Sequence, residues 1–129
     1  MRLNEFLKEN ILLMDGAMGT YYQQLHENSE NIAELANLLE SNIVKKIHRE
    51  YLEAGADLIR TNTFAANSVV LSKLSQSVRE DLLRRGCRLA KQAVEEEKAR
   101  TGRECFVAAD IGPIAGVALK VGPETHLAT

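Results

Sequence analysis

The sequence predicts an α/β protein with parallel strands, on the evidence of three apolar runs, the helical patterns between them and the turn residues that follow each run. The strands predicted from these runs cover residues 11–14, 58–63 and 105–109, and the apolar part of the second is Leu58-Ile59. The first is short, continuous and bounded by turn residues, which is typical of a strand buried on both faces. Strands separated by helices lie parallel and are joined by right-handed crossovers. This order leaves two architectures open, a doubly wound sheet and a (β/α) barrel.

Short helices are expected on either side of the first strand, over residues 4–8 and 21–25. Residues 41–54 have the clearest helical pattern, because one face recurs at spacings of three and four. That face consists of Val44, Ile47, His48, Tyr51 and Leu52. Gly55 is placed to end this helix, since glycine readily takes the left-handed conformation that follows a helix C-terminus.

Two more helices are expected between the second and third strands. The first covers residues 65–74. The second begins at a capping box, with Ser77 at the N-cap and Glu80 three residues later. It continues for roughly twenty residues, and Gly102 closes it. Cys87 lies on an apolar stripe of this helix and Cys105 begins the third strand, so both are expected to be small core residues.

The composition excludes several classes of protein. The 129 residues include 16 Lys and Arg against 18 Asp and Glu, a net charge of −2, so the clustered positive charge of a nucleic-acid binder is missing. The sequence has no run of about 18 apolar residues, the length that a membrane-spanning helix needs. Residues 1–16 do not resemble a signal peptide. The two cysteines do not make a disulfide framework, so we expect reduced thiols in a cytoplasmic protein.

Unusual loops follow all three strands, at residues 15–20, 61–64 and 110–113. In both open architectures ligands bind at the carboxyl ends of the strands, where these loops lie. Asp15 could accept hydrogen bonds from an ammonium group, while Gly16 and Gly19 let backbone N–H groups approach a carboxylate. The loop could thus hold both ends of an α-amino acid. The alternative is a strand-to-helix turn in which Asp15 only caps the following amides.

The other polar residues near these loops have structural alternatives as well. Asn62 and Thr63 could donate to a substrate carboxylate, but the pattern alone favours a role in fixing the neighbouring loop. Asp110 could act as an acid or base, although a carboxylate before Gly-Pro is more often a turn former. Arg60 interrupts an apolar strand and is expected to form a salt bridge. His48 is expected to be packed and hydrogen-bonded in the core. No spacing typical of a metal site occurs.

Three stretches together resemble the homocysteine S-methyltransferase family. Residues 11–20 are similar to its first strand and loop, residues 47–64 to its second helix–strand unit, and Ile111-Gly112-Pro113 to the turn after its third strand. They occur in the family's order and span most of residues 10–116. The nearest resemblance is to the homocysteine-binding modules of methionine synthases and of bifunctional homocysteine methyltransferase/methylenetetrahydrofolate reductase proteins.

The resemblance implies a zinc-dependent (β/α)8 TIM barrel that transfers a methyl group to the sulfur of homocysteine and forms methionine. Zinc deprotonates the thiol, so that the thiolate can attack an activated methyl. The implied donor is methyltetrahydrofolate or a cobalamin-bound methyl, with S-methylmethionine or a betaine as alternatives. In the family the first loop holds the amino-acid part of homocysteine, which maps here onto Asp15, Gly16, Ala17 and Met18. Asn62 and Thr63 are carried over to the same pocket.

The sequence also departs from the family. The helix that begins at Ser41-Asn42 has Pro-Glu in many relatives, which is a minor change. The family's zinc ligands are cysteines in the later half of the barrel, including a Gly-Gly-Cys-Cys-type stretch, and neither Cys87 nor Cys105 matches them. A (β/α)8 barrel has roughly 250 residues. We therefore expect residues 1–129 to be the N-terminal portion of one homocysteine-binding domain, about three β/α units, without catalytic or metal-binding residues of its own.

Two expectations follow from this incompleteness, and two other functions compete with the enzyme. The chain by itself should not catalyse methyl transfer, and its open edges should make it marginally stable or self-associating. A competing function is a non-catalytic amino-acid-binding module, or one that completes a barrel with a second chain. A third interpretation is another barrel enzyme that shares only the front loops.

Overall fold

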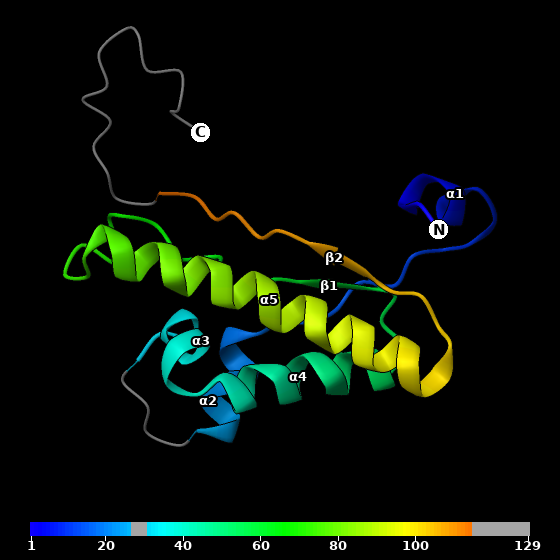
Figure 1. Cartoon of the computed structure of the whole chain (residues 1–129), viewed down its shortest axis with the longest axis horizontal. Helices are drawn as coiled ribbons and strands as arrows, with labels where there is room; N and C mark the ends of the chain where they lie inside the picture. Colours follow the sequence, from blue (N-terminus) through cyan, green and yellow to red (C-terminus); the bar gives the residue numbers. More distant parts are fainter. Residues whose placement is uncertain (27–30, 115–129) are drawn as a thin grey trace, which may run out of the picture.

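The computed structural model describes residues 1–26 and 31–114, in which helices alternate with parallel strands (Figure 1). This confirms the predicted α/β class. Most of residues 114–129, where the sequence predicts no regular element, lie outside the described part. The elements are α1 (Leu3–Glu9), α2 (Gly19–Leu25), the 3₁₀ turn η1 (Ala33–Leu35), α3 (Ala36–Leu39), α4 (Ser41–Glu53), β1 (Leu58–Arg60), α5 (Gln76–Thr101) and β2 (Phe106–Ala108).

Three segments lie side by side in the order in which they occur in the sequence. Strands β1 and β2 pair in parallel, with Leu58 opposite Phe106. On the other side of β1, Met14 forms an isolated parallel bridge to Leu58. The backbone N–H of Asp15 also donates to the carbonyl of Leu58 over 3.0 Å. The carboxyl ends of all three segments therefore meet at one edge of the sheet.

The expectation of a buried strand over residues 11–14 is wrong. The segment contributes one bridge rather than a ladder, and Ile11 is 95% exposed and Leu13 55% exposed. It forms the outer edge of the described sheet, and no described strand lies beyond it. Its apolar side chains therefore have a neighbour on one side only.

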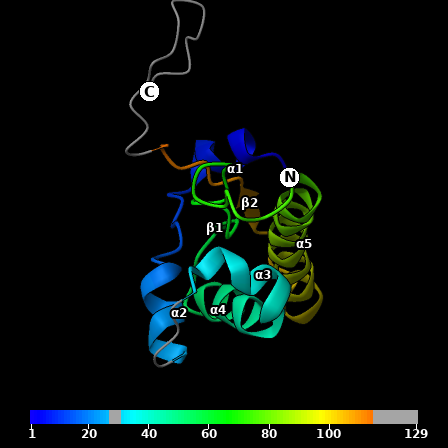
Figure 2. The ribbon, with the colours of Figure 1, turned by 90° about the vertical axis from the view of Figure 1, so that its left-hand side faces the viewer.

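Helices α4 and α5 lie together on one face of the strands, with α2 and α3 beside α4 (Figure 1, Figure 2). Four of the five residues on the α4 face that the sequence period predicts are buried, and the fifth, Tyr51, is partly buried. None of the described helices has the length and apolar character needed to cross a bilayer. The two core clusters include Tyr22, Val44, Ile47 and Leu89 in the first, and Leu52, Ile59, Ala90 and Ala93 in the second.

The two long helices end where the glycines predict. Gly55 follows α4 with a φ of 110°, and Gly102 follows α5 with a φ of 76°. Both values lie in the left-handed region, which costs an L-residue with a Cβ more than glycine. Each glycine turns the chain into the strand that follows.

The segment before α5 differs from the expectation. The N-cap of α5 is Ser75, whose Oγ accepts a hydrogen bond from the Val78 N–H over 3.2 Å, and Ser77 lies inside the helix. Residues 65–74 form turns rather than the expected helix. Here the side-chain oxygen of Asn67 accepts hydrogen bonds from the N–H groups of Val69 and Val70, at 3.0 and 2.9 Å. Such local side-chain bonds compete with helix formation.

The sequence predicts that Cys87, Cys105 and His48 lie in the core. The prediction is confirmed for Cys105 and in part for His48. Cys105 is buried, whereas Cys87 is exposed, so its assignment to the core is wrong. Cys87 lies on the side of α5 that faces the strands, where it borders an open hollow between α5 and β2 instead of packing in the core. His48 is fully buried as expected, but neither of its ring nitrogens has a hydrogen-bond partner among the residues that the structure describes.

Candidate functional site

A pocket of about 370 Å³ lies at the carboxyl edge of the sheet, where the three loops meet. It is lined by residues 15–19 after the first segment, by Ala33 and Glu34 of η1, by residues 60–64 at the end of β1, and by Asp110 after β2. All six residues that the sequence suggests for substrate binding line this pocket: Asp15, Gly16, Ala17, Met18, Asn62 and Thr63.

Asp15 is held by Arg60 at the rim of this pocket. The Arg60 Nε donates to Asp15 Oδ1 over 2.9 Å, and the backbone N–H of Arg60 donates to Oδ2 over 3.0 Å. The Asp15 side chain is only 4% exposed. The hydrogen bond with Asp15 raises the pKa of Arg60, so the guanidinium stays charged. This confirms the expected salt bridge of Arg60, and it means that both oxygens of Asp15 already have donors.

Tyr51 of α4 supports the first loop from behind. Its hydroxyl donates to the carbonyl of Ala17 over 2.6 Å. Burial, with a smaller contribution from the charge of Asp15, raises the pKa of the Tyr51 phenol, so the hydroxyl keeps its proton. A Cβ on Gly16 would lie 2.9 Å from the Tyr51 ring and hydroxyl. Gly16 is therefore needed for close approach to Tyr51, and not for a left-handed φ.

Two carbonyl contacts orient the amides of the first loop. The carbonyl of Gly16 accepts from Arg60 Nη2 over 3.1 Å, and that of Ala17 accepts from Tyr51. In a trans peptide, the N–H of the next residue points away from the carbonyl. The N–H groups of Ala17 and Met18 thus face away from Arg60 and Tyr51, and neither has an acceptor within residues 1–26 and 31–114. They remain free to bind an anion.

A chain of hydroxyl groups joins the loops after β1 and β2. The Oγ1 atoms of Thr61 and Thr63 lie 2.7 Å apart, and Thr63 Oγ1 donates to the carbonyl of Asp110 over 2.7 Å. The Asp110 N–H returns a hydrogen bond to Thr61 Oγ1 over 3.1 Å. Thr63 has thus used its one hydroxyl proton, and its role here is to hold Asp110 at the pocket.

Asn62 also has a structural role in this arrangement. Its Nδ2 donates to the carbonyl of Ala33 over 2.8 Å and to Asn37 Oδ1 over 2.9 Å. Asn37 in turn donates to the carbonyl of Asn62 over 2.8 Å. Both side-chain protons of Asn62 are engaged, so this residue fixes η1 against the end of β1.

Sequence reasoning missed Glu34 and Tyr51. Glu34 is 7% exposed and lines the pocket. Burial raises the pKa of its carboxyl group, and the charge of Asp110 adds to this. Nothing in the local sequence distinguishes Glu34 from a solvent-exposed glutamate, because its burial depends on loops that are distant in the chain. Tyr51 is recognisable only as part of the periodic face of α4.

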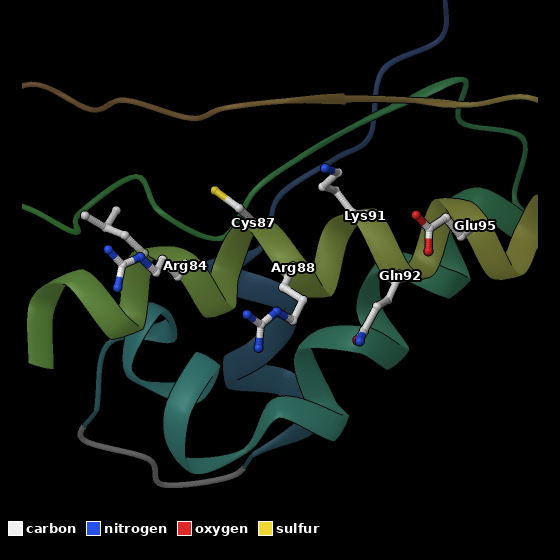
Figure 3. Close-up of a pocket in the computed structure, with 7 residues that line it drawn as sticks. Arg84, Cys87, Arg88, Lys91, Gln92 and Glu95 are labelled. Atoms are coloured by element: carbon white, nitrogen blue, oxygen red, sulfur yellow. The ribbon is translucent and has the colours of Figure 1, made fainter.

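A larger hollow of about 580 Å³ lies along the outer face of α5. Its lining comes from this one helix, and in Figure 3 the side chains of Cys87 and Lys91 extend on the strand side while Arg88 extends on the opposite side. No loop or second element converges on it within the described chain. The smaller pocket at the strand ends is therefore the better candidate for a binding site.

The family comparison covers most of the chain. A family model described as homocysteine S-methyltransferase matches residues 12–129. The chain belongs to this family. The segments that carry the match include all three loops around the pocket. This confirms the resemblance inferred from residues 11–20, 47–64 and 111–113.

Solved structures from the same family show the same fold. The metallated form of the homocysteine methyltransferase MmuM from Escherichia coli superposes with a TM-score of 0.75 at 23% identity, over 87% of this chain and 41% of that chain. The oxidized form of MmuM gives a TM-score of 0.74 at 25% identity, over 86% of this chain and 40% of that chain. The apo form gives a TM-score of 0.67 at 26% identity, over 83% of this chain and 38% of that chain. The chain spans about two fifths of the length of these homocysteine methyltransferases.

The described residues do not fit the zinc that the family resemblance implies. Within residues 1–26 and 31–114 no group of three or more His, Cys, Asp and Glu side chains could hold a metal ion. Burial raises the pKa of the Cys105 thiol, which disfavours the thiolate that binds zinc. Cys87 is exposed on α5, apart from the pocket. No metal-dependent step can be derived from these residues.

Proposed function

We propose that this chain is the homocysteine-binding front of a (β/α)8 barrel whose complete form methylates the sulfur of homocysteine to give methionine. Residues 1–129 would form about three of the β/α units of a single domain. The observation that carries the proposal is the clamped first loop, in which Tyr51 and Arg60 hold the carbonyls of Ala17 and Gly16. This loop resembles the family's amino-acid-binding loop and lines the pocket at the strand ends.

The strand order supports a barrel over a doubly wound sheet. Segment 11–14, β1 and β2 are neighbours in sequence order, and the long helices α4 and α5 lie on one face. A doubly wound sheet reverses its strand order and has helices on both faces. In a barrel each strand follows its predecessor and the helices form an outer ring.

The open side of β2 supports the same proposal. A hollow of about 480 Å³ between α5 and β2 is lined by residues that include Cys87, Val94 and Val107. The next β/α unit of a barrel would pack there. Sequence reasoning placed Cys87 in the core, and it would be covered in the complete domain.

The pocket suits the head group of an α-amino acid. The free N–H groups of Ala17 and Met18 can donate to its carboxylate, and Asp15 and Gly16 fix the loop that presents them. Asn62 and Thr63 act by holding η1 and Asp110 around the ligand. Each of the six residues therefore has a role in binding the ligand, and none of them has a role in the methyl transfer itself.

Activation of the sulfur lies outside the described residues. A free thiol has a pKa of about 8.5 and its thiolate is the nucleophile, so the complete enzyme needs a group that removes the proton. The family resemblance alone supports three further parts of the proposal. These are a zinc ion, a methyl donor (methyltetrahydrofolate or a cobalamin-bound methyl) and a cytoplasmic location.

A second candidate function is non-catalytic binding of an amino acid, either alone or with a second chain that completes the barrel. In the second case the partner chain would supply the metal ligands that the described residues lack. Co-purification of a complementing chain that carries metal ligands, with methionine formed only by the pair, would favour the barrel-completing form of this candidate.

Isothermal titration calorimetry of the full chain with L-homocysteine tests the proposed binding function. L-Leucine is the control, since it has the same head group without a sulfur. We expect saturable binding of L-homocysteine, and we expect Asp15→Ala to weaken it because the loop loses its anchor to Arg60. Lack of binding to the wild-type chain, or unchanged affinity in Asp15→Ala, would contradict this assignment.

A further inference from the structure

Glu34 is a buried carboxylate that faces the same pocket as the first loop. It lies in the middle of η1 and is 7% exposed. The backbone amides of Glu34 and Ala65 lower the pKa of its carboxyl group, against the larger effect of burial, which raises it. The turn itself is fixed by Asn62, whose Nδ2 donates to the carbonyl of Ala33 over 2.8 Å. The turn that carries Glu34 is thus held at the pocket before any ligand arrives.

Of the carboxylates at the pocket, Asp15 has a positively charged partner and Glu34 has none among the described residues. Asp15 is paired with Arg60 at 2.9 Å. Glu34 has no ion pair with any Lys, Arg or His in the part of the chain that the structure describes, and the charged neighbour that acts on it, Asp110, is also negative. A buried carboxylate without a counter-ion is costly to ionise, which agrees with the raised pKa of Glu34.

The pocket also has a polarity that matches a zwitterion. The free amides of Ala17 and Met18 lie on the side of the first loop, where Arg60 and Asp15 balance each other, whereas Glu34 and Asp110 come from η1 and from the loop after β2. Arg60 and Glu34 both interact electrostatically with Asp110. A carboxylate is therefore favoured on the loop side and a cation on the η1 side.

We propose that Glu34, and not Asp15, receives the ammonium group of the α-amino acid. This rests on the proposed function, and it gives the specificity for the amino group to a residue outside the first loop. A ligand ammonium group in the pocket supplies the counter-ion that Glu34 lacks. Asp15, whose two oxygens already have donors from Arg60, then serves to position the loop.

Calorimetry on the full chain with two ligands tests the proposal. The ligands are L-homocysteine and 4-sulfanylbutanoate, which is the same molecule without its amino group. The wild-type chain should bind L-homocysteine at least about tenfold more tightly, the range expected for one charge-assisted hydrogen bond. In Glu34→Gln this ratio should fall to about one to two, while the affinity for 4-sulfanylbutanoate stays within about twofold.

Three further variants make the result specific. Glu9→Gln removes an exposed carboxylate on α1 and should leave the ratio unchanged. Asp15→Asn should weaken the binding of both ligands and leave the ratio of their affinities unchanged. Glu34→Asp withdraws the carboxylate by one methylene and should give an intermediate ratio, so it provides a second test if Glu34→Gln melts at a lower temperature than wild type.

The outcomes separate this inference from the proposed function. If the wild-type chain prefers L-homocysteine and Glu34→Gln keeps that preference, Glu34 is not the acceptor and the proposed function stands. The same holds if Asp15→Asn abolishes the preference instead. If the wild-type chain binds both ligands equally, the inference alone fails. If it binds neither ligand, the proposed function fails and the inference fails with it.

Discussion

Arg60 and Asp15 form an ion pair that ties the end of β1 to the first loop, with 2.9 Å between Arg60 Nε and Asp15 Oδ1. The same guanidinium donates to the carbonyl of Gly16. One side chain thus fixes both the carboxylate and the backbone of the loop. The geometry of the candidate site depends on this pair more than on any glycine flexibility within the loop.

Replacing Arg60 by Met should destabilise the chain. The Asp15 side chain, 4% exposed, would lose its charged partner, and leaving a buried acceptor without a partner costs about 1–3 kcal/mol. Urea denaturation followed by circular dichroism measures the change. Arg49→Met is the matched control, because Arg49 pairs with Glu53 on the exposed surface of α4 and should contribute less than about 1 kcal/mol. Equal losses in the two variants would contradict the buried role of the Arg60 pair.

Gly16→Ala should distort the first loop. Its Cβ would lie 2.9 Å from the Tyr51 ring and hydroxyl, so the loop or the ring must move, at a cost of about 1–3 kcal/mol. Binding of L-homocysteine should weaken together with the melting temperature. Gly19→Ala serves as the control, since a Cβ on Gly19 would meet no atom of the described residues within 4 Å. In the double variant with Tyr51→Ala the added methyl group has room, so Gly16→Ala should then cost little; a full cost there would refute the steric explanation.

The stability of the chain should depend on pH through His48. Burial lowers the pKa of His48 to about 4, against about 6.5 in an unfolded chain. Between these values the unfolded state binds a proton that the folded state excludes, so stability falls as the pH drops from about 6.5 to 4, by up to about 3 kcal/mol. His48→Leu should lack this contribution. Denaturation curves from pH 4 to 7.5 provide the test, and parallel profiles for the two proteins would exclude His48 as the cause.

The chain by itself should self-associate. Ile11, Leu13 and Phe64 are large apolar side chains that are more than half exposed. Exposed apolar groups beside an open sheet edge favour association. Sedimentation velocity at several concentrations should show oligomers, and Ile11→Asn with Leu13→Asn should reduce them. A monodisperse wild-type monomer with a cooperative melt would mean that the chain is stable without the remaining barrel.

Local patterns predicted those features that local interactions determine. The ends of α4 and α5 follow from Gly55 and Gly102, and the burial of α4 follows from its period. The salt bridge of Arg60 follows from an arginine within an apolar strand. The three loops meet in one pocket because the carboxyl ends of neighbouring parallel strands share an edge.

Features that depend on distant partners were not predictable. The apolar run 11–14 indicates burial, yet only β1 lies beside it in the described chain. One local feature was also missed, because Ser77 fits a capping box but Ser75 has the extended backbone that an N-cap requires. The burial of Glu34 results from the packing of η1 against the end of β1, and its own sequence neighbours give no sign of it.

Backbone amide chemical shifts test the central claim most directly. In a ¹⁵N–¹H spectrum of the full chain, titration with L-homocysteine should move the resonances of Ala17 and Met18 most, in proportion to the saturation found by calorimetry. Tyr51→Phe should reduce both the shifts and the affinity, because the Ala17 carbonyl loses its donor. Saturable binding that moves resonances along α5 and leaves those of Ala17 and Met18 in place would contradict the account.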